Sequence, residues 1–155
     1  MSIVEIESLS HRYGNGAVAL DDVNLRIEAG QFVVIAGANG SGKTTLLRHL
    51  NGLLLPQAGT VIVAGMNVSK NLKRARQIVG MVFQDADSQI VGETVFDDVA
   101  FGPENLNLPE EEVRRRVMEA LEAVGLWHLR RRRPHLLSGG EKRRLAIAGV
   151  LTTSP

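Results

Sequence analysis

The sequence contains no cysteine, no long apolar run and almost no net charge. Without cysteine, disulfide bonds and thiolate metal sites are excluded. The four histidines, His11, His49, His128 and His135, show no metal-ligand spacing. No apolar run approaches the roughly 18 residues that a membrane-spanning helix needs. The net charge of +1 gives no large field that would attract nucleic acid or anionic lipid.

A targeting segment is not expected at the N-terminus either. The first ten residues include two glutamates and no basic residue, whereas a secretory signal begins with a basic region. The 155 residues, 44% of them hydrophobic, are enough for one domain with its own core. We therefore expect a cytoplasmic protein whose membrane association, if it has any, comes through a partner.

Segments with alternating or continuous apolar residues are predicted to be strands, and segments in which apolar residues recur with helical periodicity are predicted to be helices. A run buried on both faces, as in a parallel sheet, is indicated at residues 32–36, which are continuously apolar and largely β-branched. The other predicted strands lie at residues 3–13, 23–27, 60–63 and 78–83. Helices are predicted directly after residue 44 and from Pro109, whose first turn carries three glutamates. The pattern is typical of an α/β fold.

A glycine-rich loop between the predicted strand 32–36 and the following helix fits the motif G-x-x-x-x-G-K-[ST] completely. Its residues are Gly37, Ala38, Asn39, Gly40, Ser41, Gly42, Lys43 and Thr44, and Thr45 follows directly. The glycines let the backbone turn tightly and bring its N–H groups, with the helix N-terminus, against an anion. Lys43 can place its ammonium on the β- and γ-phosphates, and Thr44 can place its hydroxyl on Mg²⁺. The loop by itself indicates a nucleotide binder, since kinases, GTPases and motor ATPases share it.

A second motif, Leu137-Ser138-Gly139-Gly140-Glu141, precedes an apolar helical run. Ser138 is a good N-cap and Glu141 stands three residues later, which is the spacing of a capping box. Two interpretations remain open for this motif alone. It is either a helix start and nothing more, or a helix start whose exposed Ser-Gly-Gly binds an anion.

Tyr13, the loop, Gln84 and the second motif, in this order, resemble the ATP-binding-cassette family over nearly the whole chain. The resemblance implies that Tyr13, which otherwise would be read as ordinary packing, stacks on adenine. It also implies that Lys43 and Gln84 act in catalysis, with Gln84 near Mg²⁺ or the attacking water. Ser138, Gly139, Gly140 and Glu141 would form the signature that grips ATP bound to a second ATPase subunit, identical or different. Glu141 stands where the family often has glutamine.

Residues 80–109 are similar to the corresponding segment in ATPases of energy-coupling-factor importers, which take up vitamins or cobalt and nickel ions. The implied function is the ATP-binding subunit of an importer on the cytoplasmic face of the membrane, docked on a transmembrane subunit. We expect the surface for that partner between Gln84 and Leu108. Ile90 and Val91 are expected at the surface, and Val95, Val99 and Phe101 are expected in the core.

The resemblance also implies groups that this sequence does not contain. No apolar run ends in Asp-Glu, so the Mg²⁺-binding aspartate and the water-polarising glutamate of the family are missing. We interpret the chain as stopping at Pro155 before that strand, and we expect residues 32–36 to lack a strand neighbour. Two alternatives stay open: a nucleotide-binding but catalytically incomplete chain, and a soluble cassette ATPase of DNA repair or translation. The second class favours long coiled-coil or basic insertions, and the sequence has neither.

The predicted organisation has three segments. Residues 1–84 form the β-rich part with an antiparallel N-terminal portion and the P-loop core sheet. Residues 85–136 form a helical subdomain, and residues 137–155 carry the signature and its helix. The arginine run 130–133 could indicate nucleic acid, but residues 78–155 hold 12 acidic against 10 basic side chains. A solvated helix end fits that balance better, so no nucleic-acid partner is expected.

Overall fold

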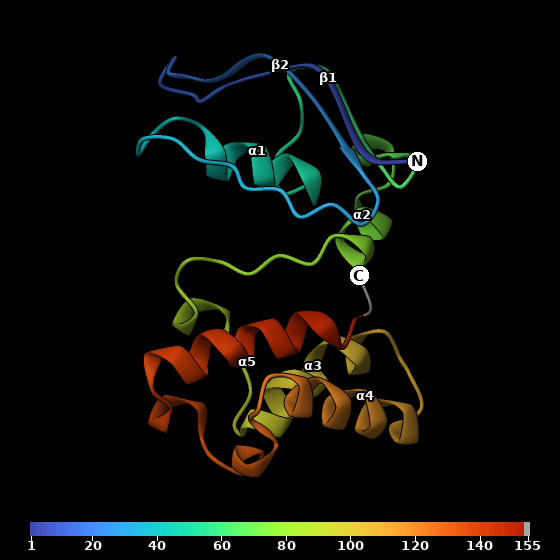
Figure 1. Ribbon diagram of the computed structural model, residues 1–155, viewed down its shortest axis with the longest axis vertical. Coiled ribbons are helices and arrows are strands. Elements are labelled where there is room, and N and C mark those ends of the chain that lie inside the picture. The colour runs from blue at the N-terminus through green and yellow to red at the C-terminus, as the bar shows by residue number, and fades with distance from the viewer. Residues whose placement is uncertain (154–155) are drawn as a thin grey trace. The chain divides into compact units, whose positions relative to one another are not determined.

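The computed structural model describes residues 1–153. The chain divides into two compact units between Val79 and Gly80. In Figure 1, unit 1 runs from blue to green along the chain, and unit 2 runs from green to red. Among the described residues, no helix combines the length and the apolar character that crossing a membrane requires.

Unit 1 is built on a four-stranded antiparallel sheet with the order β2-β1-β3-β4. Its strands are β1 (Ser2–Arg12), β2 (Val18–Glu28), β3 (Ala58–Val63) and β4 (Met66–Asn67). The first three coincide with predicted strands. A register shift in the middle of β1, where Ser8 has a φ of 47°, interrupts the alternation of side chains. Because of this shift, Leu9 and His11 are buried on the same side as Ile6.

Two helices complete unit 1, α1 (Lys43–Leu50) and α2 (Leu72–Ile78), together with a short 3-10 turn at Val68–Lys70. Helix α1 is the helix predicted to follow the glycine-rich loop, although it begins at Lys43, within the loop motif, and it buries Leu46 against the sheet. The core of unit 1 is one apolar cluster of Ile6, Leu9, Leu20, Leu46, Val61, Val63, Val68 and Ala75. This cluster fixes where β1 and the start of α1 lie relative to each other.

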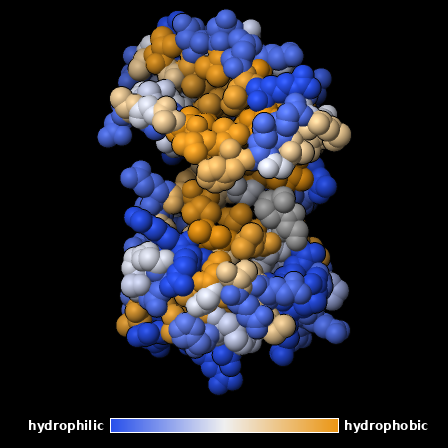
Figure 2. Space-filling model, in the orientation of Figure 1, coloured by the Kyte–Doolittle hydropathy of each residue, from blue (hydrophilic) through white to orange (hydrophobic). Residues whose placement is uncertain are grey.

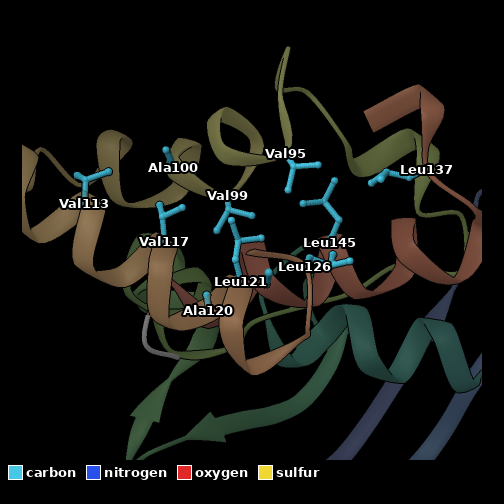
Figure 3. Packing of buried hydrophobic residues seen from close by; sticks show 11 residues of the cluster. Val95, Val99, Ala100, Val113, Val117, Ala120, Leu121, Leu126, Leu137 and Leu145 are labelled. Carbon is cyan, nitrogen blue, oxygen red and sulfur yellow. The ribbon is translucent and has the colours of Figure 1, made fainter. Parts of the chain in front are cut away.

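Unit 2 is helical and has three main helices, α3 (Val95–Asn105), α4 (Glu110–Ala123) and α5 (Gly139–Leu151). Short 3-10 turns lie at Asp87–Gln89, Trp127–Leu129 and Pro134–Leu136. Figure 3 shows the apolar side chains of the three helices directed toward one another. Helix α4 starts after Pro109 and ends before Gly125, which has a φ of 70°. Residues of the expected third segment pack into this same unit through α5.

Two predicted strands do not form. Residues 32–36 have no regular structure, and the Phe32 and Val34 side chains are 93% and 74% exposed. The second predicted strand, 78–83, begins with the last residue of α2 and continues without a strand partner in residues 1–153. A strand needs neighbouring backbone to bond with, and the sheet of the described residues contains only β1 to β4. Figure 2 shows hydrophobic residues on the surface of unit 1.

The fold class predicted from the sequence is nevertheless confirmed. The structure is an α/β fold with an antiparallel β part in unit 1 and a helical part in unit 2.

Candidate functional site

The glycine-rich loop 37–44 lies in unit 1 and leads into α1. Gly40 and Gly42 have φ values of 82° and 88°, in the left-handed region that favours glycine. A Cβ atom on Gly42 would lie 2.3 Å from the carbonyl oxygen of Ala19 in β2, whereas one on Gly40 would meet nothing within 4 Å. Gly42 is therefore required both by its conformation and by its close approach to the sheet.

Lys43 turns its ammonium group into the loop. Its Nζ donates to the carbonyl oxygens of Gly37 at 2.8 Å and Ala38 at 2.7 Å. The hydroxyl of Ser41 is 3.4 Å away. Both carbonyls belong to the loop, so the positive charge is already held where the loop closes. Because Lys43 is also the first residue of α1, its charge adds to the N-terminal end of the helix dipole. The arrangement is suited to an oligophosphate.

Thr44 is the residue predicted to contact Mg²⁺, and its side chain is exposed beside Lys43. Among the described residues, no group of three or more histidine and acidic side chains is placed to hold a metal ion. The hydroxyl of Thr44 fits one position of an octahedral Mg²⁺, for which the phosphates and water supply most of the ligands.

Tyr13 follows the end of β1 and reaches the start of α1. Its hydroxyl lies 2.9 Å from the hydroxyl of Thr45, which is buried. The residue remains 40% exposed, so its ring is not a core side chain. The structure therefore brings Tyr13 and Thr45 together with the loop in unit 1.

His49 was not predicted as part of the site. It is fully buried in α1, and its Nδ1 lies 2.8 Å from the carbonyl oxygen of Thr45. A carbonyl only accepts, so Nδ1 carries the proton. Burial lowers the pKa of His49 below its usual value, and the neighbouring His11 lowers it further, while hydrogen bonds with the backbone of Thr45 and Leu55 oppose the change.

The lowered pKa of His49 predicts that acid destabilises unit 1. Well above pH 6.5 the ring is neutral in both states, but below that value the unfolded chain takes up a proton that the folded chain resists. The free energy of unfolding should therefore fall as the pH decreases from about 6.5 toward the lowered folded pKa, with a slope of at most about 1.4 kcal/mol per pH unit. Urea titrations at a series of pH values measure this slope.

His49→Gln tests this prediction. His135→Gln is the control, because His135 is exposed. Glutamine keeps a donor for the Thr45 carbonyl and does not titrate. His49→Gln should flatten the pH dependence, and His135→Gln should leave it unchanged. An equally steep dependence in His49→Gln would show that another group is responsible.

Gln84 lies in unit 2 and is exposed in the stretch between α2 and α3. The side chain of Gln89, which the sequence did not single out, closes this stretch. Its Oε1 accepts from the backbone N–H of Phe83 at 3.0 Å, and its Nε2 donates to the carbonyl of Met81 at 2.9 Å. Gln89 therefore holds both sides of a loop that presents Gln84 to solvent.

The signature motif begins α5, also in unit 2. Ser138 and Glu141 form the predicted capping box: the Ser138 N–H and hydroxyl donate to Glu141 Oε2 at 2.7 and 2.9 Å, and the Glu141 N–H donates to the Ser138 hydroxyl at 3.3 Å. These bonds from the Ser138 backbone and hydroxyl lower the pKa of Glu141, which keeps it ionised. Gly139 and Gly140 are exposed, and nothing lies where their Cβ atoms would be. The helix start is open to a ligand.

An ion pair joins the signature helix to the segment that follows Gln84. Lys142 Nζ lies 2.5 Å from Asp87 Oδ1, and the Lys142 side chain is only 18% exposed. Unit 2 thus connects two of the motifs through a contact that no sequence motif indicates. The predicted site residues fall into two sets, Tyr13 with residues 37–45 in unit 1 and Gln84 with residues 138–141 in unit 2.

Comparison with known proteins places this geometry in a family. Residues 20–155 match the family described as ABC transporter. The chain is 55% identical over 159 residues to the energy-coupling factor transporter ATP-binding protein EcfA1 of Symbiobacterium thermophilum, covering 96% of this chain and 55% of the relative. It is 51% identical over 156 residues to EcfA of Methanothermobacter thermautotrophicus, covering 99% of this chain and 50% of the relative. The chain thus spans about half the length of these relatives.

Two solved structures from ABC transporters have the same fold as this chain. The structure of cbiO1 from Clostridium perfringens, described as part of the ABC transporter complex cbiONQ, has a TM-score of 0.90 and 40% identity, covering 99% of this chain and 62% of that chain. A dimeric bacterial ABC transporter cassette has a TM-score of 0.86 and 30% identity, covering 98% of this chain and 70% of that chain.

Proposed function

Because the chain belongs to the ABC transporter family, we propose that it is the ATP-binding part of an importer subunit that couples ATP binding and hydrolysis to uptake. The observation that carries this proposal is the loop 37–44, with the Lys43 ammonium held at its centre. ATP would bind with its phosphates on this loop and its adenine on Tyr13. Thr44 and Gln84 would contact the Mg²⁺ that accompanies ATP and neutralises charge on its phosphates.

Two such subunits, identical or different, would enclose ATP between them. Each would offer Ser138, Gly139 and Gly140 to the γ-phosphate bound by the other. The open helix start of α5 supports this role, as does the similarity to a dimeric cassette. The ionised Glu141 would stand close to the same phosphate and would weaken the grip of the signature relative to a glutamine.

The importer class is proposed from the relatives named as energy-coupling factor ATP-binding proteins. The cargo would be a metal ion or a vitamin, selected by a transmembrane subunit. The protein would then lie on the cytoplasmic face of the membrane, held there by its partner.

Hydrolysis needs groups beyond those in this sequence, so we predict that these 155 residues alone turn over ATP slowly or not at all. No apolar run ends in Asp-Glu, which leaves out an aspartate that would bind Mg²⁺ and a glutamate that would polarise water. A phosphate-release assay should find turnover at least about 100-fold below that of the full-length protein, the scale of losing a positioned catalytic base. Comparable turnover by both would show that the residues here are sufficient.

The partner surface is proposed between Gln84 and Leu108, centred on Val91. The Val91 side chain is 63% exposed, while its backbone N–H donates to Asp98 Oδ1 at 2.7 Å. The segment is therefore held firmly with an apolar side chain outward. Val95 and Val99 are fully buried, as predicted, whereas Ile90 is half-buried against the same cluster and Phe101 is 53% exposed. The prediction that Phe101 belongs to the core was wrong.

In the full-length protein, Val91→Asp should abolish co-purification with the transmembrane subunit and leave the affinity for ATP unchanged. A charge placed in the apolar centre of an interface costs several kcal/mol when it has no partner. Val18→Asp is the matched control, because Val18 is 47% exposed and lies in unit 1. If Val91→Asp keeps the complex, or loses ATP binding along with it, the partner surface lies elsewhere.

A further inference from the structure

We propose that Thr45, His11 and His49 are positioning residues that hold the ring of Tyr13 ready to stack on a purine base. The proposal rests on the nucleotide site proposed above and extends it to residues that do not touch the base. It concerns four side chains in unit 1, two from the end of β1 and two from α1.

The spacing of these residues follows from the two elements that carry them. His11 and Tyr13 are two residues apart, which directs side chains of an extended chain to the same side. Thr45 and His49 are four residues apart in α1, which places them one above the other on a helix face. The bulge in β1 turns His11 to the buried side of the sheet, against which α1 packs.

The four residues form a closed circuit of contacts, in which the link from Thr45 to His49 runs through the backbone carbonyl of Thr45. The hydroxyls of Tyr13 and Thr45 are 2.9 Å apart, and the Thr45 carbonyl accepts from His49 Nδ1 at 2.8 Å. The His49 ring meets the His11 ring at 4.9 Å between centroids with an angle of 74°. The His11 ring meets the Tyr13 ring at 5.1 Å and 81°. Both are edge contacts of the kind that aromatic rings favour.

The backbone of Tyr13 is fixed as well. Its N–H donates to the carbonyl of Ala17 at 3.0 Å, and its carbonyl accepts from the N–H of Gly16 at 2.8 Å. Contacts thus hold the backbone of Tyr13, its hydroxyl and the edge of its ring, while 40% of the residue remains exposed. A ring that is immobile before its ligand arrives loses little conformational entropy on binding, which increases affinity.

Ordinary packing does not account for this arrangement. A core tyrosine would be buried. Here the hydroxyl of Tyr13 bonds the buried hydroxyl of Thr45 from another element, while Tyr13 itself stays 40% exposed. Thr45 directly follows Lys43 and Thr44, so the circuit ties the proposed base site to the phosphate loop.

Calorimetric titration of the full-length protein with Mg-ATP and with inorganic triphosphate tests the proposal. Tyr13→Phe keeps the ring and removes its anchor, and Thr45→Val removes the same hydrogen bond from the other side. Each should weaken Mg-ATP roughly three- to tenfold, the value of one neutral hydrogen bond. Triphosphate, which has no base, should bind as to the wild type. The double variant should lose no more than either single variant, and Thr45→Ser should restore Mg-ATP affinity.

A second pair tests the ring contact. His11→Phe keeps an aromatic edge against Tyr13 and should keep most of the Mg-ATP affinity. His11→Leu removes the edge contact and should lose affinity for Mg-ATP by a few fold, again without an effect on triphosphate.

Tyr13→Leu separates failure of this proposal from failure of the proposed function. If Tyr13→Leu weakens Mg-ATP while Tyr13→Phe does not, stacking stands and positioning through the hydroxyl is overturned. If Thr45→Val weakens both ligands equally, Thr45 acts on the phosphates and the positioning role is again overturned. If Tyr13→Leu changes nothing, Tyr13 is not the base site, and the adenine part of the proposed function fails with it.

Discussion

Gly42→Ala should abolish ATP binding, with a loss of affinity of at least about 100-fold. Gly42 has a φ of 88°, and an added Cβ would lie 2.3 Å from the Ala19 carbonyl oxygen. The left-handed conformation alone costs an alanine roughly 1–3 kcal/mol. The contact with backbone adds to that cost, because β2 cannot move aside as a flexible side chain would. The loop must therefore shift away from the sheet, which displaces Lys43.

Gly40→Ala is the matched control for this prediction. Gly40 has almost the same φ, 82°, but its Cβ would meet nothing within 4 Å. It should show the strain alone, so its loss of affinity should be clearly smaller than that of Gly42→Ala. Mg-ATP affinity of both variants, with thermal unfolding measured beside it, separates loop displacement from general instability. Equal losses in the two variants would mean that the approach to β2 does not matter.

Lys43→Ala should weaken ATP binding by roughly 30- to 1000-fold, corresponding to about 2–4 kcal/mol for a charged group with several hydrogen bonds to phosphate. Lys43 is the only lysine in the loop. Its ammonium is already directed inward by the carbonyls of Gly37 and Ala38. On binding, phosphate oxygens would replace these carbonyls as hydrogen-bond acceptors, and the Lys43 ammonium would need to move only a little.

Two variants calibrate the effect of Lys43. Lys73→Ala removes the same charge from an exposed position on α2 of the same unit and should leave the affinity unchanged. Lys43→Arg keeps the charge but presents a planar fork instead of a compact ammonium, so an intermediate loss is expected. Competition with a fluorescent ATP analogue gives all the affinities. A loss in Lys73→Ala as large as that in Lys43→Ala would point to overall charge instead of a specific contact.

The sequence was sufficient where a local pattern decides the structure. Alternation predicted β1 and β2, and residues 60–63, which were predicted as a further strand, form β3. The capping box predicted the start of α5, since Ser138 and Glu141 satisfy the first N–H groups of the helix by themselves. The glycine-rich loop was predictable for the same reason, because its glycines are required by backbone conformation.

The sequence was insufficient where structure depends on partners that lie far along the chain. Residues 32–36 have the composition of a buried strand but form none, which agrees with the expectation that they lack a strand neighbour. Residues 78–83 were misread because a short apolar run fits a helix end as well as a strand, and Ile78 ends α2.

The same limit applies to the candidate site. The sequence motifs identified Tyr13, the loop, Gln84 and the signature as site residues. They did not indicate which contacts hold these residues in position. The link between Tyr13 and Thr45 joins residues that are 32 positions apart. The loop closure by Gln89 and the ion pair of Lys142 with Asp87 join residues up to 55 positions apart. Such contacts follow from the tertiary fold.

The central claim is that residues 37–44 bind the phosphates of ATP, and hydrogen–deuterium exchange of the full-length protein with and without Mg-ATP tests it most directly. Bound phosphate should protect the backbone N–H groups of the loop and of the first turn of α1. Lys43→Ala should remove that protection at the same ATP concentration. Exchange in the loop that stays unchanged at saturating Mg-ATP, with protection elsewhere in the chain, would contradict the account.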